Sequence, residues 1–218
     1  VDILERPSFD LLPLLRRNRD VRLQVLTGLA SQAILRPNAL YPPFNDPRAR
    51  LALSYIIDQD DQMAGGYGDA DYYQRCNSFF VCGSPNGTEA GAEDFRPDLP
   101  RARQLLAEAG YKGEPIRMPA TRDIAYMGPM AEVAADAMRR AGLNVQLDWS
   151  DWASVVSRTG NQGAPEAGGW NIYVSGMPGV LAWTPGTNIF AAMPCDRSNL
   201  SGWPCDAEVE ALRARYAD

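Results

Sequence analysis

Histidine is absent from the 218 residues of this sequence. Because histidine is the commonest general base, the base of the usual catalytic triad and the commonest metal ligand, its absence argues against enzymes and metal sites of those kinds. An enzyme built on paired carboxylates stays open, although no acidic pair stands out at a useful spacing. We therefore expect a protein that is not an enzyme, with no resident metal and no cofactor.

Lysine is almost absent too, since Lys112 is the only one and arginine supplies the other basic side chains. The net charge at pH 7 is −6, and the isoelectric point is near 4.8. No basic stripe with interleaved aromatic residues occurs, which argues against nucleic acid as a partner. Hydrophobic residues make up 45% of the sequence and charged residues 22%, a balance typical of an ordinary globular domain.

Long apolar runs are missing as well. The longest fall far short of the ~20 residues that a membrane-spanning helix needs, and no signal peptide is visible. The sequence opens with Val1 rather than an initiator methionine. We expect a fragment of a longer protein, in which a missing leader says nothing about location.

Cysteine is scarce, and its four residues form two local pairs, Cys76 with Cys82 and Cys195 with Cys205. Neither pair has C-x-x-C spacing, and no histidine completes a zinc site. We predict a disulfide within each pair, which points to an oxidising compartment such as a periplasm. Four free, buried thiols in a cytosolic chain remain the alternative.

The first third of the sequence mixes regular and irregular segments. Apolar spacing predicts a helix over 9–17 and a half-buried strand over 21–25. The prolines within 41–44 predict extended backbone. Residues 65–97 are the least regular stretch, and a bridge from Cys76 to Cys82 would pin this long loop.

A helix is also expected just after the prolines. Asp46 is a good N-cap, and Pro47 suits the first helical position. The apolar face continues to about Met63, and Gly65-Gly66 is expected to end the helix.

The second half of the sequence alternates helices and strands. This order requires right-handed crossovers and predicts an α/β fold with a mainly parallel mixed sheet and flanking helices. The expected helices are 99–109, 130–138, 151–158 and 206–216, and the expected strands are 116–119, 143–149 and 170–175.

Tryptophan is concentrated in one stretch, 148–183, which holds Trp149, Trp152, Trp170 and Trp183. Because ligands of open α/β sheets bind beyond the carboxyl ends of strands, we look for function here. A set of core tryptophans between ordinary turns is the alternative.

Residues 38–58, N-A-L-Y-P-P-F-N-D-P-R-A-R-L-A-L-S-Y-I-I-D, resemble the family 5 extracellular solute-binding proteins. The family pattern is an Asn, then P-P-F-x-D, R-x-R-x-A-L and an Asp. It falls here on Asn38, Pro43, Phe44, Asp46, Arg48, Arg50, Ala52, Leu53 and Asp58. Blocks at 98–111 and 131–147, then D-W and G-G-W-N-I-Y, continue the resemblance in family order.

The resemblance implies the second large lobe of a type II, peptide-binding-class periplasmic binding protein. Residues 1–190 would form this lobe, and 191–218 a loop-rich tail with a short helix of the same lobe, ending before the return to the first lobe. Such proteins are two-lobed receptors of ABC importers for peptides, nickel, opines and related solutes. The implied partners are a peptide-like or other small solute and a permease. The implied location is the periplasm, or a lipid anchor outside the cytoplasm.

The resemblance also implies candidate ligand-binding residues. Arg122 matches an arginine that holds the ligand carboxylate in dipeptide-binding members, and a guanidinium fork suits that role. Trp152 matches a pocket-lining tryptophan of oligopeptide-binding members, and Trp183 could cover a ligand. A solvated loop arginine and packing tryptophans are the alternatives.

One stretch departs from the peptide-binding pattern. Met177 stands where those members have a tryptophan, and Val180 where they have the aspartate that binds the peptide amine. This departure argues against a ligand held by a free α-amino group. We expect the backbone of 176–180, with Gly176 and Gly179, to form hydrogen bonds with the ligand instead.

Two rival functions remain open. Asp148 and Asp151 could converge as the carboxylates of a hydrolase, although Asp151 is also the natural N-cap of the 151–158 helix. The chain could otherwise belong to a chaperone or signalling receptor that binds a partner without transport.

Overall fold

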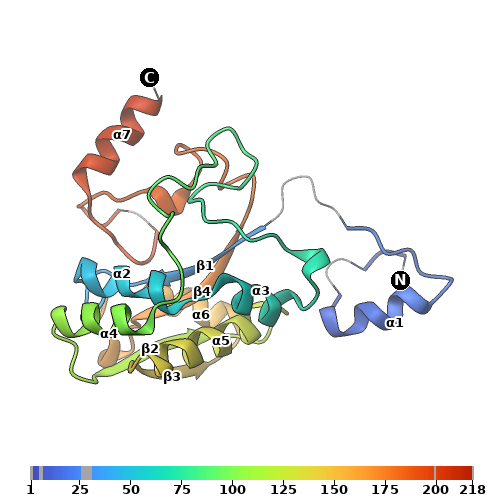
Figure 1. Cartoon of the computed structure of the whole chain (residues 1–218), viewed down its shortest axis with the longest axis horizontal. Coiled ribbons are helices and arrows are strands. Elements are labelled where there is room, and N and C mark those ends of the chain that lie inside the picture. Colours follow the sequence, from blue (N-terminus) through green and yellow to red (C-terminus); the bar gives the residue numbers. More distant parts are fainter. Residues whose placement is uncertain (1, 5–6, 26–30, 199, 218) are drawn as a thin grey trace.

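A computed structural model describes residues 2–4, 7–25, 31–198 and 200–217 of the chain (Figure 1). The α-helices are α1 (Leu12–Arg17), α2 (Pro47–Ile56), α3 (Gln59–Tyr67), α4 (Leu99–Glu108), α5 (Met127–Arg140), α6 (Trp152–Thr159) and α7 (Ala207–Ala217). The strands are β1 (Ser31–Pro37), β2 (Pro115–Ala120), β3 (Asn144–Trp149) and β4 (Ile172–Pro178). Short 3₁₀ turns are η1 (Phe9–Leu11), η2 (Ala70–Tyr72), η3 (Pro165–Ala167) and η4 (Ile189–Ala191).

The strands form two ladders. β2 and β3 run parallel, with Pro115 opposite Asn144, whereas β1 and β4 run antiparallel, with Ser31 opposite Pro178. The mixed α/β character predicted from the sequence is therefore present, with a larger antiparallel share than expected. The difference arises because β1 was not among the expected strands, since its sequence S-Q-A-I-L-R-P lacks a clear alternation.

Asn171 joins the two ladders. Its N–H donates to the Arg117 carbonyl at 2.9 Å, and its Oδ1 accepts from the Arg117 N–H at 2.8 Å. Its Nδ2 donates to the Pro42 carbonyl at 3.0 Å. Because Asn171 is almost fully buried, these bonds satisfy polar groups that water cannot reach. They place β4 of one pair beside β2 of the other, so that the two pairs lie edge to edge.

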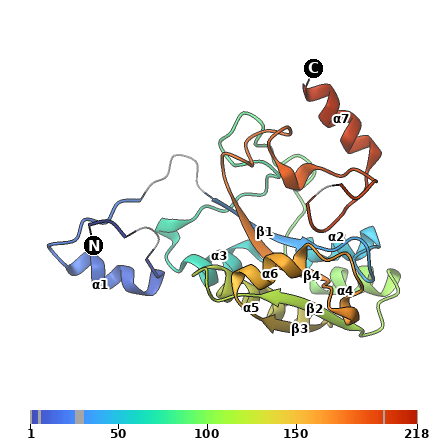
Figure 2. The same ribbon diagram turned by 180° about the vertical axis from the view of Figure 1, so that it is seen from behind.

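The main core lies between the sheet and the helices α2, α3, α4 and α5. Helix α5 connects β2 to β3 and turns a face of Ala and Met residues inward, so that its backbone can approach the strands closely. Helix α6 contacts β2 and lies on the side of the sheet that faces the viewer in Figure 2. No helix in the described part of the chain is long and apolar enough to span a membrane.

The helix expected from Asp46 to Met63 is two helices. Asp46 caps α2 as predicted, accepting the Arg48 N–H at 2.8 Å, but Ile57 is extended and ends it. Asp58 then caps α3 in the same way, through the Asp60 N–H at 2.8 Å. Asp58, which follows the extended Ile57, starts a new helix. Apolar spacing alone does not reveal this break.

The prediction that Gly65-Gly66 ends this helix is wrong, because both residues lie inside α3. A Cβ on Gly65 would lie 2.7 Å from the Val133 side chain, and one on Gly66 would lie 2.6 Å from that of Met130. The glycines therefore serve close packing of α3 on α5 rather than helix termination.

Two further local expectations fail. Residues 41–44 form a turn instead of extended backbone: Pro42–Pro43 is a cis bond, and the Asn45 N–H donates to the Tyr41 carbonyl at 3.0 Å. Residues 21–25 lack strand structure, because the ladders among described residues pair β1 with β4 and β2 with β3. They lie on an N-terminal arm that extends from the body (Figure 1).

The helix predicted over 9–17 is present as η1 and α1, on the same arm. Phe9 contacts the Tyr67 ring edge-on, with centroids 5.1 Å apart. Arg16 lies 3.5 Å from Asp71 and 3.9 Å from Asp69. These contacts hold the arm against the end of α3.

The C-terminal tail packs on the rest of the chain. Arg36 of β1 donates from Nε to the Ser201 carbonyl at 3.0 Å, and Trp203 lies 5.9 Å from the Trp170 ring. Arg213 of α7 donates to the Pro185 carbonyl at 3.2 Å. Both predicted disulfides, Cys76–Cys82 and Cys195–Cys205, are present in the structure.

Candidate ligand-binding site

The carboxyl ends of β2 and β3 bring Arg122 and Trp149 together. Arg122 follows β2 by two residues, and Trp149 is the last residue of β3. The guanidinium carbon lies 3.8 Å from the centroid of the tryptophan ring, a close cation–π contact. The parallel pairing of β2 with β3 places both residues at the same edge of the sheet.

Glu132 on α5 binds the same guanidinium. Its Oε1 accepts from Arg122 Nη2 at 3.0 Å, and both side chains are more than half exposed. Within the described part of the chain Glu132 is the only hydrogen-bond acceptor of Arg122, so Nε and Nη1 stay available. A ligand carboxylate would bind beside Glu132 or replace it.

Arg122 also lines an open hollow of about 400 Å³. Its other lining residues are Ser8, Asp123, Ala125, Gly128, Pro129 and Glu132. A Cβ on Gly128 would lie 3.1 Å from the Thr121 carbonyl, so a small residue keeps the start of α5 close to the end of β2. The hollow carries mixed charge, because two acids share it with one arginine.

Trp152 has a divided environment. It starts α6, is half-buried and packs against the main core. Its N–H donates to Asp123 Oδ2 at 2.8 Å, which ties α6 to the loop that carries Arg122. Its packing agrees with the core alternative, and the pocket role implied by the resemblance stays a prediction.

Gly176 and Met177 lie inside β4 and not in the loop that the sequence predicted. They stand opposite Ala33 and Gln32 of β1, so the ladder already engages this stretch of backbone. A Cβ on Gly176 would collide with the Tyr126 hydroxyl. Met177 is 3% exposed and packs with Ala182 and Phe190, so its side chain belongs to the core.

The chain turns immediately after β4. The Ala182 N–H donates to the Gly179 carbonyl at 3.0 Å, and Gly179 is buried. Val180 is 52% exposed, and Trp183 is half-buried with its carbonyl accepting from Asn86 Nδ2 at 3.1 Å. Of the residues predicted from this stretch, Val180 is thus the one whose side chain is most open to a ligand.

The two carboxylates of the rival hydrolase have separate structural partners. Asp148 lies between Arg117 at 2.6 Å and Arg158 at 2.8 Å. Asp151 caps α6, and hydrogen bonds from the Ser154 hydroxyl and then its N–H hold the pKa of Asp151 below its ordinary value. The lowered pKa of Asp151 does not suit a general acid, which needs a raised pKa. Asp148 is engaged by two guanidinium groups and is the centre of a structural bridge.

Sequence reasoning missed Glu132 and Tyr126 and did not select Trp149. Of these three residues, only Trp149 could have been selected from the sequence, because it ends the strand expected over 143–149. Glu132 and Tyr126 lie on or beside α5, and only the packing of this helix on the sheet brings them to the strand ends.

The comparisons with known proteins identify this fold. The model of the bacterial extracellular solute-binding proteins, family 5 Middle, matches residues 1–195. The chain belongs to this family. The family is one of solute-binding proteins. The chain is 34% identical over 218 residues to the probable peptide ABC transporter periplasmic-binding protein y4tO of Sinorhizobium fredii.

The match covers 99% of this chain but 41% of that protein, so the chain spans well under half of its relative. Among solved structures, the Helicobacter pylori DppA protein in complex with the peptide STSA has a TM-score of 0.79 at 18% identity, covering 96% of this chain and 40% of that one. A dipeptide-binding protein from Pseudoalteromonas sp. SM9913 in complex with Met-Leu has a TM-score of 0.72 at 24% identity, covering 95% and 40%. These likenesses confirm the predicted fold class of a type II periplasmic-binding-protein lobe.

Proposed function

We propose that the chain is the second lobe of a solute-binding receptor that delivers a peptide-like or other small organic solute to an ABC importer. The observation that carries this proposal is the pairing of Arg122 with Trp149 at the strand ends of a family 5 fold. Aromatic surface beside an arginine offers apolar contact and a charge anchor. Closure of a second lobe over this face would bury the solute.

The proposed partners and location follow from the relative. The Sinorhizobium fredii protein is described as a probable peptide ABC transporter periplasmic-binding protein. We assign this chain to the same setting, the periplasm or an anchored position outside the cytoplasm, with a permease as its partner. The two disulfides support an oxidising compartment.

The proposed domain organisation places residues 1–190 in the lobe and 191–218 in its tail. Contacts of Ser201, Trp203 and Arg213 with earlier segments support the assignment of the tail to the same body.

The proposed ligand differs from an ordinary peptide at one end. Val180 replaces the aspartate that the family resemblance gives for the peptide amine, and no charged residue occurs from 167 to 195. An ammonium group buried against Val180 would find no carboxylate on the neighbouring residues of this segment, which is costly. The solute is therefore expected to carry its charge on the Arg122 side and to present a neutral part to Val180.

Binding without turnover is part of the proposal. It is supported by the separate structural roles of Asp148 and Asp151. A receptor needs differential affinity for the open and closed states, whereas a hydrolase needs a positioned acid or base.

Mass spectrometry of the solute released from denatured, full-length protein tests this function. We expect a small organic molecule in about equimolar amount, and its return to the stripped protein should raise the melting temperature by mass action. Recovery of a partner protein in place of a small molecule, or conversion of the solute during incubation, would refute transport binding. Co-purification with a chemoreceptor and not a permease would favour signalling.

A further inference from the structure

A second, apolar surface lies beside the end of β4. It consists of Phe79, Phe80, Val180 and Leu181, here called the apolar patch. Phe79 and Val180 are each 52% exposed and Leu181 is 39% exposed, while the rings of Phe79 and Phe80 meet edge-on with centroids 5.5 Å apart. Large apolar side chains held in water in this way are a common mark of binding surfaces.

Two loops far apart in the sequence carry the patch. The Val81 N–H donates to the Ala182 carbonyl at 3.4 Å, and Asn86 Nδ2 donates to the Trp183 carbonyl at 3.1 Å. Val81 also packs on the core formed by Met177, Ala182 and Phe190. The green and orange loops accordingly lie side by side in Figures 1 and 2.

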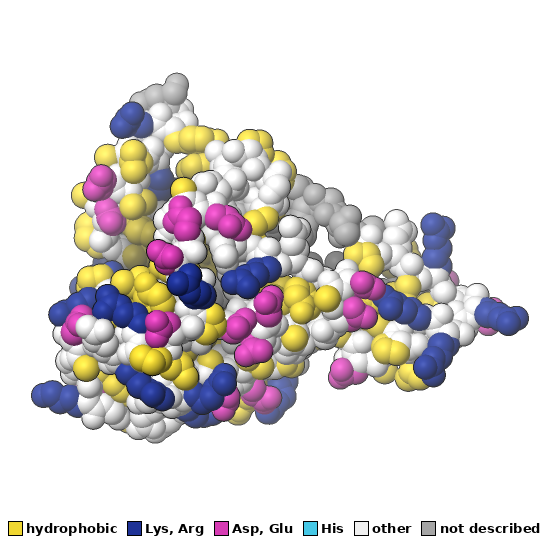
Figure 3. All heavy atoms as spheres, viewed as in Figure 1, with side chains coloured by type: hydrophobic (Ala, Val, Ile, Leu, Met, Phe, Trp, Pro, Cys, Tyr) yellow, Lys and Arg dark blue, Asp and Glu magenta, His cyan; other side chains and the backbone are white. Residues whose placement is uncertain are grey.

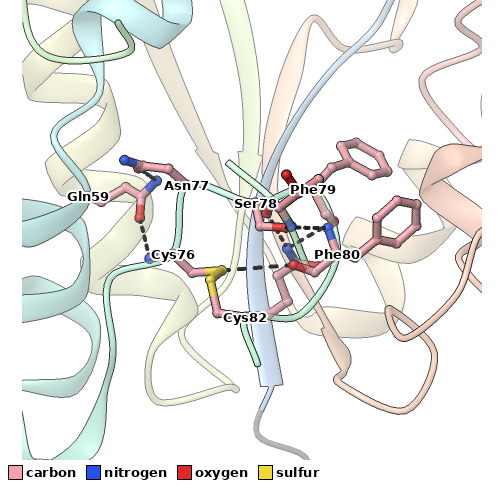
Figure 4. Close-up of a disulfide and its surroundings, with 9 residues drawn as sticks. Gln59, Cys76, Asn77, Ser78, Phe79, Phe80 and Cys82 are labelled. Atoms are coloured by element: carbon pink, nitrogen blue, oxygen red, sulfur yellow. Dashed lines mark hydrogen bonds between the residues drawn. A yellow bond between two sulfur atoms is a disulfide. The ribbon is translucent and has the colours of Figure 1, made fainter. Parts of the chain in front are cut away.

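The first loop is rigidly built. The Cys76–Cys82 disulfide closes it, and the buried Ser78 hydroxyl accepts from the Phe80 N–H at 3.2 Å and the Thr88 N–H at 3.0 Å. Figure 4 shows both phenyl rings pointing to the same side, away from Gln59 of α3. The aromatic side chains are thus presented by a fixed loop.

The patch adjoins the candidate site. Gln32 of β1, which stands opposite Met177 of β4, donates from Nε2 to the Phe79 carbonyl at 3.3 Å. A Cβ on Gly176, the preceding residue of β4, would collide with the hydroxyl of Tyr126, which lies next to the start of α5 and the Arg122 hollow. The patch and the hollow therefore flank the same strand end.

The two segments that carry the patch contain no charged residue. No Asp, Glu, Lys or Arg occurs within 76–88 or within 167–195, in a chain with 22% charged residues. In Figure 3, the top of the molecule over these loops shows hydrophobic and neutral atoms, with acidic side chains just below them. A charged group buried against these apolar side chains would lose water, and the side chains themselves offer it no counter-ion, so the patch favours an uncharged, apolar group.

We propose that the apolar patch is a specificity subsite that receives a hydrophobic side chain of the solute. The inference rests on the proposed function and adds a selection rule to it. Arg122 anchors an anionic end of the solute, and the patch beside the end of β4 accepts an apolar part. The disulfide acts as a positioning element, because it fixes the loop that presents Phe79 and Phe80.

The test uses the full-length protein, stripped of solute, and a mixture of N-acetylated alanine tripeptides, which carry no α-ammonium group. Each carries Leu, Phe, Asp or Lys at one of the three positions, and the retained peptides are quantified by mass spectrometry. Wild-type protein is expected to prefer Leu and Phe over Asp and Lys by about tenfold, as burial of one such side chain predicts. Phe79→Ser should reduce this preference to about twofold.

A matched control is Leu51→Ser, which changes an exposed apolar residue of α2 away from the patch and should keep the wild-type preference. Cys76→Ser with Cys82→Ser keeps the patch chemistry but frees the loop, and should give an intermediate preference. A full preference for Leu and Phe in Phe79→Ser would overturn the subsite.

Retention of none of the tripeptides would count against a peptide-like solute, and the subsite is then judged with Nile red, an uncharged apolar dye. Saturable binding that Phe79→Ser weakens about fivefold supports the subsite, and equal binding to both proteins overturns it. A changed X-ray scattering profile of the ligand-free Phe79→Ser protein, with unchanged dye binding and peptide preference, would assign the patch to contact between lobes and also overturn the proposal.

Discussion

The guanidinium of Arg122 lies over the ring of Trp149, with its central carbon 3.8 Å from the ring centroid. Glu132 holds one nitrogen of the same group at 3.0 Å. The ring and the carboxylate together hold the guanidinium in one orientation. Less rotamer entropy is therefore lost when a ligand binds. The remaining N–H groups can then form a charge-assisted pair with an anion.

Replacing Arg122 with alanine should weaken binding of an anionic solute to the full-length protein by about 1.5–3 kcal/mol. Isothermal titration with the solute identified by mass spectrometry measures this loss. Arg140→Ala is the control, since Arg140 forms an exposed pair with Asp136 on α5. Equal affinities of Arg122→Ala and wild type would remove Arg122 from the site.

The two disulfides predict a simple mass difference. Because each bridge removes two hydrogens, the non-reduced protein should be lighter than the reduced protein by about four mass units. Intact mass spectrometry with and without reductant gives the answer, and peptide mapping assigns the pairs. Labelling of four free thiols in the native protein would contradict both bridges and the argument for an oxidising compartment.

Asp148 links β3 to β2 and α6 through Arg117 and Arg158. Asp148→Asn keeps the shape but removes the charge, and leaves two arginines without their shared partner. We expect a loss of unfolding free energy of about 1–3 kcal/mol, measured by urea denaturation. Asp136→Asn, which breaks an exposed pair, should cost less than about 1 kcal/mol. Equal effects would show that the Asp148 bridges contribute little.

Gly66→Ala tests the packing of α3 on α5. In an exposed helix this change would stabilise by about 0.5–1 kcal/mol through helix propensity. Here the added Cβ would meet the Met130 side chain at 2.6 Å, so we expect destabilisation by about 1–3 kcal/mol. Ala64→Gly at an exposed position of α3 measures the propensity alone. A more stable Gly66→Ala protein would contradict the close packing.

We expect the carboxyl group of Asp46 to titrate at unusually low pH. Hydrogen bonds from the Arg48 side chain and then its N–H lower the pKa of Asp46 from 3.8 to about 2. Since the folded-state pKa is depressed, the stabilising contribution is present above pH 3.8 and is lost as pH falls towards 2. Carboxyl-carbon NMR titration should show the low midpoint, and Arg48→Ala should move it up. A midpoint near 3.8 in the wild type would disprove this cap geometry.

Several local elements could be predicted from the sequence because their causes are local. Asp46 and Asp151 each accept a backbone N–H at a helix start, as their positions before apolar helical patterns indicate. The close sequence spacing of the cysteine pairs likewise predicted both bridges. The break at Ile57 was missed, because a continuous apolar face hides a second cap at Asp58.

By itself, the sequence determined the family, the order of helices and strands in the second half, and the chemistry available at the strand ends. Tertiary structure alone decided how that chemistry is distributed. Parallel pairing of β2 with β3 set Arg122 on Trp149, and α5 supplied Glu132. Pairing of β4 with β1 placed Met177 in the core and left Val180 exposed. Contacts between residues far apart in the chain depend on how complete elements pack, and no local pattern of residues encodes that packing.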